Sequence, residues 1–173
     1  MAELTASSFM PLKGEKRWAY LTREKTIRIA STNEDGSIYL SPLWYVVNEK
    51  RIFVPLDAGG RHGGNGTSGR PLSALVDSGD EYATVHGVRI HGNLKLVSDS
   101  KIITLVNELM FDKYFYIDHP YAERYFEFGE FVGRQVYELI PEKMIGWDMR
   151  ETSLPTIPEK RNFPAHIEDR LLP

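Results

Sequence analysis

TIRIASTNEDGSIYLSPLWYVVNEKRIFVPL, residues 26–56, reads as three strands joined by two tight turns. In the first strand Ile27 and Ile29 alternate with polar or small residues, the period-two pattern of a half-buried strand. Asp35-Gly36 is typical of a hairpin turn. The stretch therefore predicts an antiparallel meander with strands at 26–31, 38–47 and 51–56.

The rest of the 173 residues continues the mainly β (α+β) pattern. Further strands are expected at 72–76, 83–97, 131–140 and 143–149. Helices are expected at 15–23, from Ser98 or Ser100 as the N-cap to about residue 114, and at 120–129. In the long strand one face is apolar, and the other carries Arg89, His91, Asn93 and Lys95. This order favours a Greek-key antiparallel barrel with a few peripheral helices. Residues 1–150 are expected to form one domain, followed by an extended, Pro-rich tail at 151–173.

Composition excludes several classes of function. A formal charge of −3 and a pI near 6.0 argue against general affinity for nucleic acid. With 0 cysteines there is no thiolate metal site and no cysteine nucleophile, and the irregular histidine spacing predicts no metal site. The sequence has no signal-peptide pattern and no apolar run long enough to span a membrane. We therefore expect a cytoplasmic protein with no membrane partner.

One glycine-rich segment interrupts the strands: GGRHGGNGTSGR, residues 59–70, which carries Arg61, His62, Asn65 and Arg70. As a loop it would bring backbone and positive charge against an anionic group such as a phosphate. Gly64 to Gly69 also match G-x-G-x-x-G, but Pro71 follows at once, where a dinucleotide site needs a crossover helix. The competing interpretation is a mobile loop whose glycines only permit tight turns.

The chain resembles the pyridoxamine 5'-phosphate oxidase-like FMN-binding split-barrel family, in its flavin/deazaflavin (coenzyme F-420)-dependent branch. The similar segments are residues 27–47, RIFVPL at 51–56 with the loop to Asn65, residues 72–93 and VYELIPEKMIGWDMR at 136–150. The resemblance implies that the six or so strands form a split β-barrel, and that the protein is a homodimer with one cofactor in each interface groove. It places the cofactor against Ser41, Pro42, Leu43, Trp44, Val54, Pro55, Leu56, Arg61, His62, Asn65 and Trp147. The family usually has Lys-x-x-Asn in the loop; here His62 replaces the lysine and Arg61 must supply the fixed charge.

No nucleophile elbow, Ser-His-Asp order or carboxylate pair is present, which suits an enzyme whose cofactor performs the chemistry. We expect an oxidoreductase that uses F-420, preferred over FMN, to transfer a hydride to an unsaturated small-molecule acceptor. The accompanying proton would come from water or from a nearby side chain, with Tyr45 and His62 as the candidates. The alternative is a non-catalytic carrier or sensor that binds flavin, deazaflavin or haem.

Overall fold

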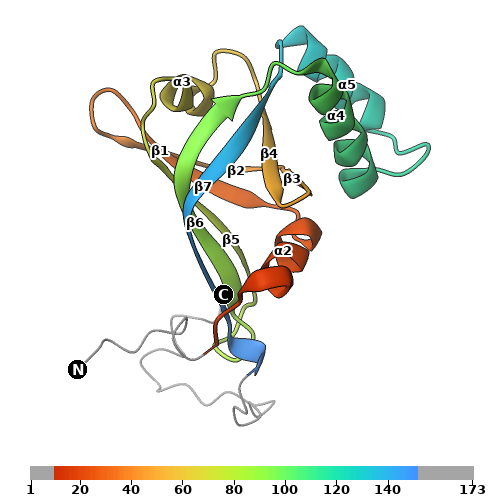
Figure 1. Ribbon diagram of the computed structural model, residues 1–173. Coiled ribbons are helices and arrows are strands. Elements are labelled where there is room, and N and C mark those ends of the chain that lie inside the picture. The colour runs from red at the N-terminus through yellow and green to blue at the C-terminus, as the bar shows by residue number, and fades with distance from the viewer. Residues whose placement is uncertain (1–9, 152–173) are drawn as a thin grey trace, which may run out of the picture.

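The computed structural model describes residues 10–151, and its centre is one antiparallel sheet of seven strands in the order β2-β1-β5-β6-β7-β4-β3 (Figure 1). The sheet curls into a half-barrel, which confirms the predicted mainly β split-barrel class, with seven strands where six were expected. The strands are β1 Ile27–Thr32, β2 Ile38–Leu43, β3 Val46–Asn48, β4 Arg51–Leu56, β5 Leu72–Ser78, β6 His86–Leu96 and β7 Gln135–Asp148. The proposed tail lies outside the described residues except for its first residue, and the domain boundary stays a prediction.

Two predicted divisions into strands differ from the structure, and the last strand starts at Gln135 instead of residue 131 because Phe131 still belongs to helix α5 (Ala122–Phe131). The segment at 38–47 breaks at Trp44-Tyr45 into β2 and β3, because the chain crosses there from one edge of the sheet to the other. The two segments at 131–140 and 143–149 form the single strand β7. Pro141 is tolerated within β7 because it pairs with Gly92 at a register shift in β6.

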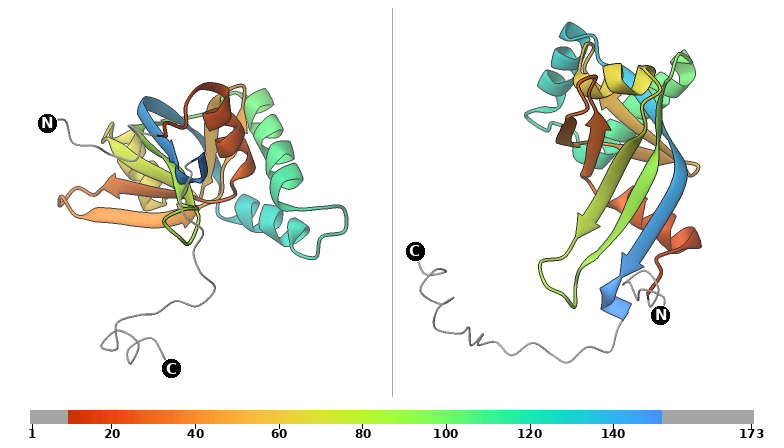
Figure 2. Two further views of the ribbon diagram at one scale, coloured as in Figure 1. Left: turned by 90° about the horizontal axis from the view of Figure 1, so that it is seen from below. Right: turned by 90° about the vertical axis from the view of Figure 1, so that its left-hand side faces the viewer.

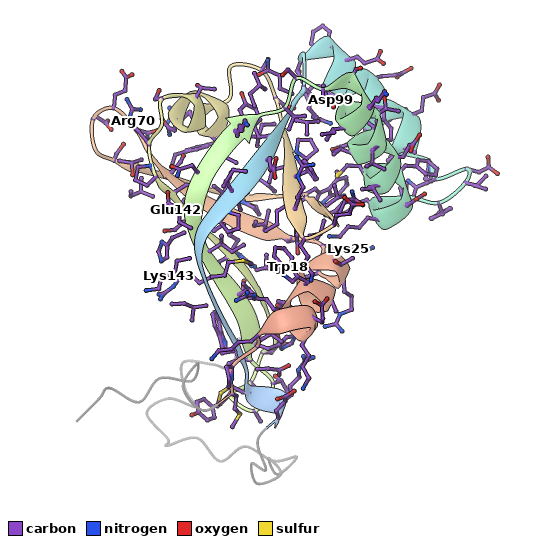
Figure 3. The ribbon with its side chains drawn as sticks, in the orientation of Figure 1. Trp18, Lys25, Arg70, Asp99, Glu142 and Lys143 are labelled. Carbon is purple, nitrogen blue, oxygen red and sulfur yellow. The ribbon has the colours of Figure 1, made fainter. Side chains whose placement is uncertain are left out.

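The concave face of the sheet carries the main hydrophobic core. Alternate residues of β1, β5, β6, β7 and β4 point inward, and helix α2 (Gly14–Arg23) covers one opening with Tyr20 and Leu21. Trp18 on the same helix packs against this core (Figure 3). The buried side chains include Ile27, Ile29, Val76, Val88, Ile90, Ile52, Val54 and Leu139. This rigid inner layer fixes the directions of β2 and β4.

A second apolar cluster joins the helical hairpin to the other side of β4 and β7. Helix α4 (Ser100–Tyr114) contributes Val106 and Met110, which pack with Phe53 and Val136. Its N-cap is Asp99, whose side chain accepts a hydrogen bond from the Lys101 backbone N–H, in place of either predicted serine. Helix α5 (Ala122–Phe131) lies beside α4, far from the β1–β2 hairpin (Figure 2). Within residues 10–151 no helix is both long and apolar enough to cross a membrane.

The convex face of the sheet is mixed in character. The register places Arg89, His91, Asn93 and Lys95 of β6 on this face, as the sequence predicts. At its edge Ile38 and Leu40 of β2 are 62% and 63% exposed. A surface of this kind leaves apolar side chains in water unless another body covers them.

Candidate functional site

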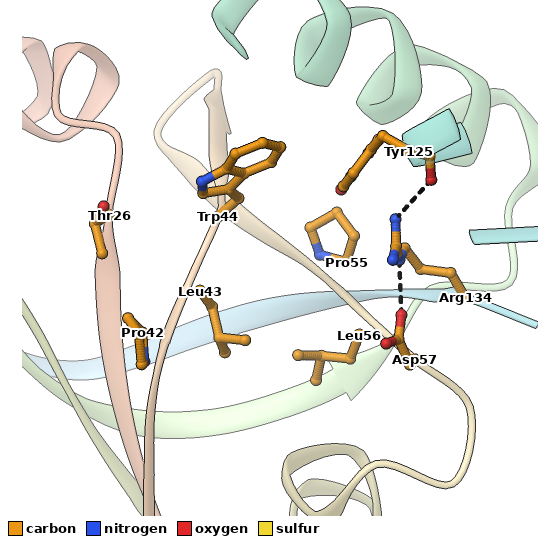
Figure 4. Close-up of a pocket in the computed structure, with 9 residues that line it drawn as sticks. All are labelled: Thr26, Pro42, Leu43, Trp44, Pro55, Leu56, Asp57, Tyr125 and Arg134. Carbon is orange, nitrogen blue, oxygen red and sulfur yellow. Dashed lines mark hydrogen bonds and ion pairs between the residues drawn. The ribbon is translucent and has the colours of Figure 1, made fainter. Parts of the chain in front are cut away.

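A pocket of about 430 Å³ opens where the barrel is split, between the ends of β2 and β4 (Figure 4). Its lining residues are Thr26, Pro42, Leu43, Trp44, Pro55, Leu56, Asp57, Tyr125 and Arg134. Five of them, Pro42, Leu43, Trp44, Pro55 and Leu56, are among the cofactor-binding candidates named from the sequence. The wall is mostly apolar and aromatic, with one ion pair at its margin.

The two prolines lie on strand segments that have a neighbour on one side only. Pro42 pairs with Arg28 in β2, which is an outermost strand of the sheet. Pro55 pairs with Val136, beyond the last residue of β4 that pairs with β3. Proline fits such positions because it lacks the N–H that a second neighbour would need.

Trp44 forms the aromatic wall and is 40% exposed. Its ring stacks on Tyr114, with centroids 4.4 Å apart, and lies 5.2 Å from the ring of Tyr125. The Tyr114 hydroxyl accepts a hydrogen bond from the Tyr45 backbone N–H at 3.0 Å and lies 2.7 Å from the carbonyl oxygen of Lys25. The end of α4 therefore holds the β2–β3 connection, and with it Trp44, in one position.

The polar margin of the pocket consists of Arg134, Asp57 and Tyr125. The Arg134 Nε donates to Asp57 Oδ1 at 2.8 Å, and Nη1 donates to the Tyr125 carbonyl oxygen at 3.3 Å. The guanidinium also lies over the Tyr125 ring, 4.4 Å from its centroid. Burial raises the pKa of the Tyr125 hydroxyl, and the nearby Arg134 partly opposes that shift.

Tyr45 lies in the core and not in the pocket. Its side chain is fully buried, and its hydroxyl donates to the Leu21 carbonyl oxygen at 2.6 Å. Burial raises the pKa of this phenol well above its usual value. Beside it, burial lowers the pKa of Lys113 to about 8, and Lys113 Nζ donates to the Tyr45 carbonyl oxygen. Tyr45 thus shapes the site from behind, and its hydroxyl is directed away from the pocket.

The glycine-rich segment is not the predicted loop, because residues Arg61–Thr67 form the short helix α3. Gly63 and Gly66 face the sheet: a Cβ on Gly66 would lie 2.7 Å from the Leu94 Cβ, and one on Gly63 would lie 2.8 Å from the Tyr137 hydroxyl. These two glycines allow the helix to pack closely against β6 and β7. The sequence interpretation assumed that the glycines bring the backbone close to a ligand; in the structure these two bring it close to the sheet.

His62 and Asn65 are engaged in a buried polar network. His62 is hydrogen-bonded through Nδ1 to Ser31 Oγ at 2.9 Å and through Nε2 to Ser41 Oγ at 2.7 Å. Asn65 Nδ2 donates to Ser31 Oγ and to Asn33 Oδ1. Burial lowers the pKa of His62 and favours the neutral ring. Both ring nitrogens therefore have partners inside the protein, which leaves His62 no free nitrogen for a ligand or for proton transfer.

The remaining candidates are dispersed. Arg61 is exposed, with its guanidinium 5.3 Å from the centroid of the Tyr39 ring. Val54 points into the core. Trp147 lies near the far end of β7, paired with Gly87. The structure thus brings together the five β2 and β4 candidates that line the pocket, whereas Ser41 joins the buried α3 residues through His62 and Trp147 lies apart.

Sequence reasoning missed four lining residues: Thr26, Asp57, Tyr125 and Arg134. Asp57 directly follows the predicted strand RIFVPL, and a charged residue at a strand end beside a candidate groove was an available signal. Tyr125 and Arg134 reach the pocket only through the packing of α5 against β4, which no local pattern encodes. Within the described residues no group of three or more His, Asp or Glu side chains could hold a metal ion.

A family model described as pyridoxamine 5'-phosphate oxidase matches residues 15–148. Among solved structures, a conserved hypothetical protein from Mycobacterium tuberculosis is similar with a TM-score of 0.74 and 21% identity, covering 88% of this chain and 94% of that one. The haem storage protein HutZ from Vibrio cholerae is similar with a TM-score of 0.63 and 17% identity, over 82% and 100% of the two chains. An FAD-binding protein from Mesorhizobium loti has a TM-score of 0.58 and 16% identity, over 78% and 92%. At these identities the structural matches show the shared fold alone, and no curated protein matches the sequence.

Proposed function

The chain belongs to the pyridoxamine 5'-phosphate oxidase family, and on that premise we propose that it is an oxidoreductase that binds a flavin or deazaflavin at the split of the barrel. The proposed reaction is hydride transfer to an unsaturated small-molecule acceptor. F-420 is the preferred cofactor and FMN the second choice. Solved structures of the same fold include FAD-binding proteins, which supports a flavin-type ligand in general.

The observation that carries the proposal is the shape and chemistry of the pocket. Two prolines, two leucines and the rings of Trp44 and Tyr125 enclose it. Flat apolar and aromatic walls fit a planar fused ring, and ligand sites typically combine such walls with a few polar groups. The described residues include no group of three or more His, Asp or Glu side chains that could hold a metal ion in place of an organic cofactor.

The inner face of β2 offers a path from the pocket toward α3. Leu43 lines the pocket, Ser41 contacts α3 through His62, and Tyr39 lies under the Arg61 guanidinium. From Leu43 to Tyr39 is four residues, or about 13 Å at the rise of a strand. We propose that the ring occupies the pocket and that the phosphate of the same cofactor reaches Arg61. His62 and Asn65 then support this path from beneath rather than contacting the phosphate.

When bound, the cofactor supplies the hydride. The chain's own residues orient the reactants: Trp44, stacked on Tyr114, provides a flat wall, and Pro42 and Pro55 line the pocket from the two strand edges. Tyr45 and His62, the proton donors expected from the sequence, have their hydroxyl and ring nitrogens engaged elsewhere. We therefore assign the proton to water, which can enter a pocket that opens to solvent.

A homodimer remains part of the proposal. The exposed Ile38 and Leu40 on the convex face give a second copy an apolar surface to cover. Light scattering or sedimentation at micromolar concentration should give twice the mass of the chain, and a monomer would contradict the proposed interface groove. The cytoplasmic location stays a prediction.

The test of function is titration of the purified protein with F-420, FMN and haem separately, followed by ring absorbance and by oxidation of the reduced cofactor with conjugated acceptors. Arg61→Ala should weaken cofactor binding about tenfold to a hundredfold, since a hydrogen bond to a charged group contributes about 1.5–3 kcal/mol. The melting temperature should hardly change because Arg61 is exposed. Arg124→Ala, an equally exposed arginine on α5, is the matched control and should leave binding intact.

A specific observation also supports a second candidate, a haem or flavin carrier. The haem storage protein HutZ has this fold over its whole length. Against haem, the pocket contains no histidine or methionine, and burial raises the pKa of its only tyrosine. Binding of F-420 or FMN without turnover would favour the carrier. Tight binding of haem, with no binding of F-420 or FMN, would reject the proposed oxidoreductase.

A further inference from the structure

Arg134 is a prepared hydrogen-bond donor at the margin of the pocket. Its side chain is only 17% exposed, and it is held by Asp57, by the Tyr125 carbonyl and by the Tyr125 ring. A guanidinium has five N–H donors, and two of its nitrogens make the hydrogen bonds described above. The remaining donors can serve a ligand without any movement of the side chain.

The backbone around Arg134 is built to admit this side chain. The Arg134 N–H donates to the Gly129 carbonyl oxygen at 2.7 Å, at the end of α5. Gly129 is buried, and a Cβ there would lie 3.1 Å from Arg134 Nη1. The absence of a side chain at Gly129 therefore leaves the space that the guanidinium occupies.

The partner in the ion pair is much less constrained. The Asp57 side chain is 47% exposed, against 17% for Arg134. An ion pair with such an exposed member contributes little to stability, about 0–1 kcal/mol. Asp57 can rotate into water at small cost, while Arg134 stays in place. The carboxylate of Asp57 thus occupies the position that an arriving anion would take.

The aromatic wall beside Arg134 indicates the shape of a ligand whose charged end would contact the guanidinium. Trp44 and Tyr125, with ring centroids 5.2 Å apart, line the same pocket as the guanidinium. A smaller hollow of about 160 Å³ shares Pro55, Tyr125 and Arg134 as its wall, so the guanidinium lies between two cavities. A flat, conjugated body fits between these two rings and the cofactor ring proposed for the leucine side of the same pocket, with its charged end toward Arg134.

We propose that Arg134 is a specificity-determining residue that binds the carboxylate of a planar, conjugated acid, and that Asp57 is displaced when this acid enters. The choice of a conjugated acid as acceptor rests on the proposed function. A cationic ligand is disfavoured because it would approach Asp57 beside the fixed positive charge of Arg134. Arg134 can hold a carboxylate through two parallel N–H donors, which a neutral amide cannot match.

The test compares cinnamate with cinnamamide, a neutral ligand of the same shape, by calorimetric titration of the full chain with and without the cofactor it binds. The native protein should prefer the acid about tenfold to a hundredfold, the value of a charge-assisted hydrogen bond. Arg134→Gln should reduce this ratio to about one, and Arg134→Lys should retain part of it. Asp57→Asn should tighten binding of cinnamate several-fold and leave cinnamamide unchanged, because it removes the competing charge.

The ratio of acid to amide within one variant is independent of how much protein is folded. Equal affinities in the native protein, no binding of either ligand, or an unchanged ratio in Arg134→Gln would each overturn the subsite. A preference for cinnamate that follows these variants supports it, even if no hydride is transferred; in that case the subsite stands and the proposed oxidoreductase activity fails. Reduction of neutral acceptors alone would overturn the subsite and leave the proposed oxidoreductase activity standing.

Discussion

The two ends of β2 contrast in how their polar groups are used. At the α3 end, the side chains of Ser31, Ser41, His62 and Asn65 bond to one another and are mostly buried. At the Trp44 end, Asp57 and Arg134 face a pocket, and half of the Asp57 side chain is in water. Residue types typical of a binding site occur at both ends, but the Ser31, Ser41, His62 and Asn65 network is turned inward, whereas Asp57 and Arg134 face open space.

This contrast separates stability from binding. A buried network whose members satisfy one another supports the fold, and removal of one member leaves others without a partner. A pair at a pocket margin contributes little to the fold and remains available to a ligand. Substitutions within the buried network at the α3 end should therefore lower stability, and those at the Trp44 end should alter binding; the exposed Arg61 lies outside that network.

The largest effect on stability is expected for Asn65→Ala. This change removes the hydrogen bonds to Ser31 and Asn33 and the acceptor of Arg70 Nη1. Leaving such groups unsatisfied costs about 2–3 kcal/mol. Asp57→Asn at the other end should cost about 1 kcal/mol or less. Urea unfolding of both variants measures the difference, and equal losses would remove the contrast.

A smaller loss is expected where α3 packs on the sheet. Gly66→Ala places a Cβ 2.7 Å from the Leu94 Cβ, and overpacking of this kind costs about 1–3 kcal/mol. Gly64→Ala on the same helix meets nothing within 4 Å and should stabilise by up to about 1 kcal/mol, because alanine is the better helix former. Thermal unfolding of the pair checks this, and a melting temperature raised by both variants would show that α3 does not pack tightly.

The smallest effect concerns pH. Burial holds the pKa of His62 below its ordinary 6.5, so between the two values the unfolded chain binds a proton that the folded chain does not. Stability should therefore be level above about pH 6.5 and decline as the pH falls below it. His62→Gln should flatten this slope. The bonded carboxylates Glu138 and Asp148, whose pKa values are lowered, act nearer pH 4, so the difference between the unfolding curves of the native protein and His62→Gln from about pH 5 to 7 isolates the contribution of this histidine.

The fold was predictable from the sequence where side chains alternate or turns are tight. The period-two pattern of Ile27 and Ile29, the Asp35-Gly36 turn and the long face from Arg89 to Lys95 all depend on local chemistry, and each agrees with the structure. The break at Trp44-Tyr45 was not predictable, because aromatic residues have high strand propensity and only the closure of the sheet forces the chain across. Helix α3 was missed because glycine is a poor helix former, and its stability comes from contacts with β6.

The candidate site was predictable in part for a similar reason. Residues adjacent in sequence on β2 and β4 could be named, since a strand presents them together. Arg134 could not, because its position depends on α5 folding back over β4, many residues from Asp57. His62 and Asn65 have side chains that could bind a phosphate. In the structure both are buried and hydrogen-bonded to other residues of the protein, which the sequence alone does not reveal.

The positions of Pro42 and Pro55 have a consequence for how the barrel can close. Both edges that face the split lack a backbone donor at the point where they approach the pocket. If both positions carried an N–H, the two edges could recruit each other or an extended peptide by strand addition, as exposed sheet edges do. The two prolines interrupt that row of backbone hydrogen bonds. The opening of the barrel therefore depends on the backbone and not on the other side chains that line it.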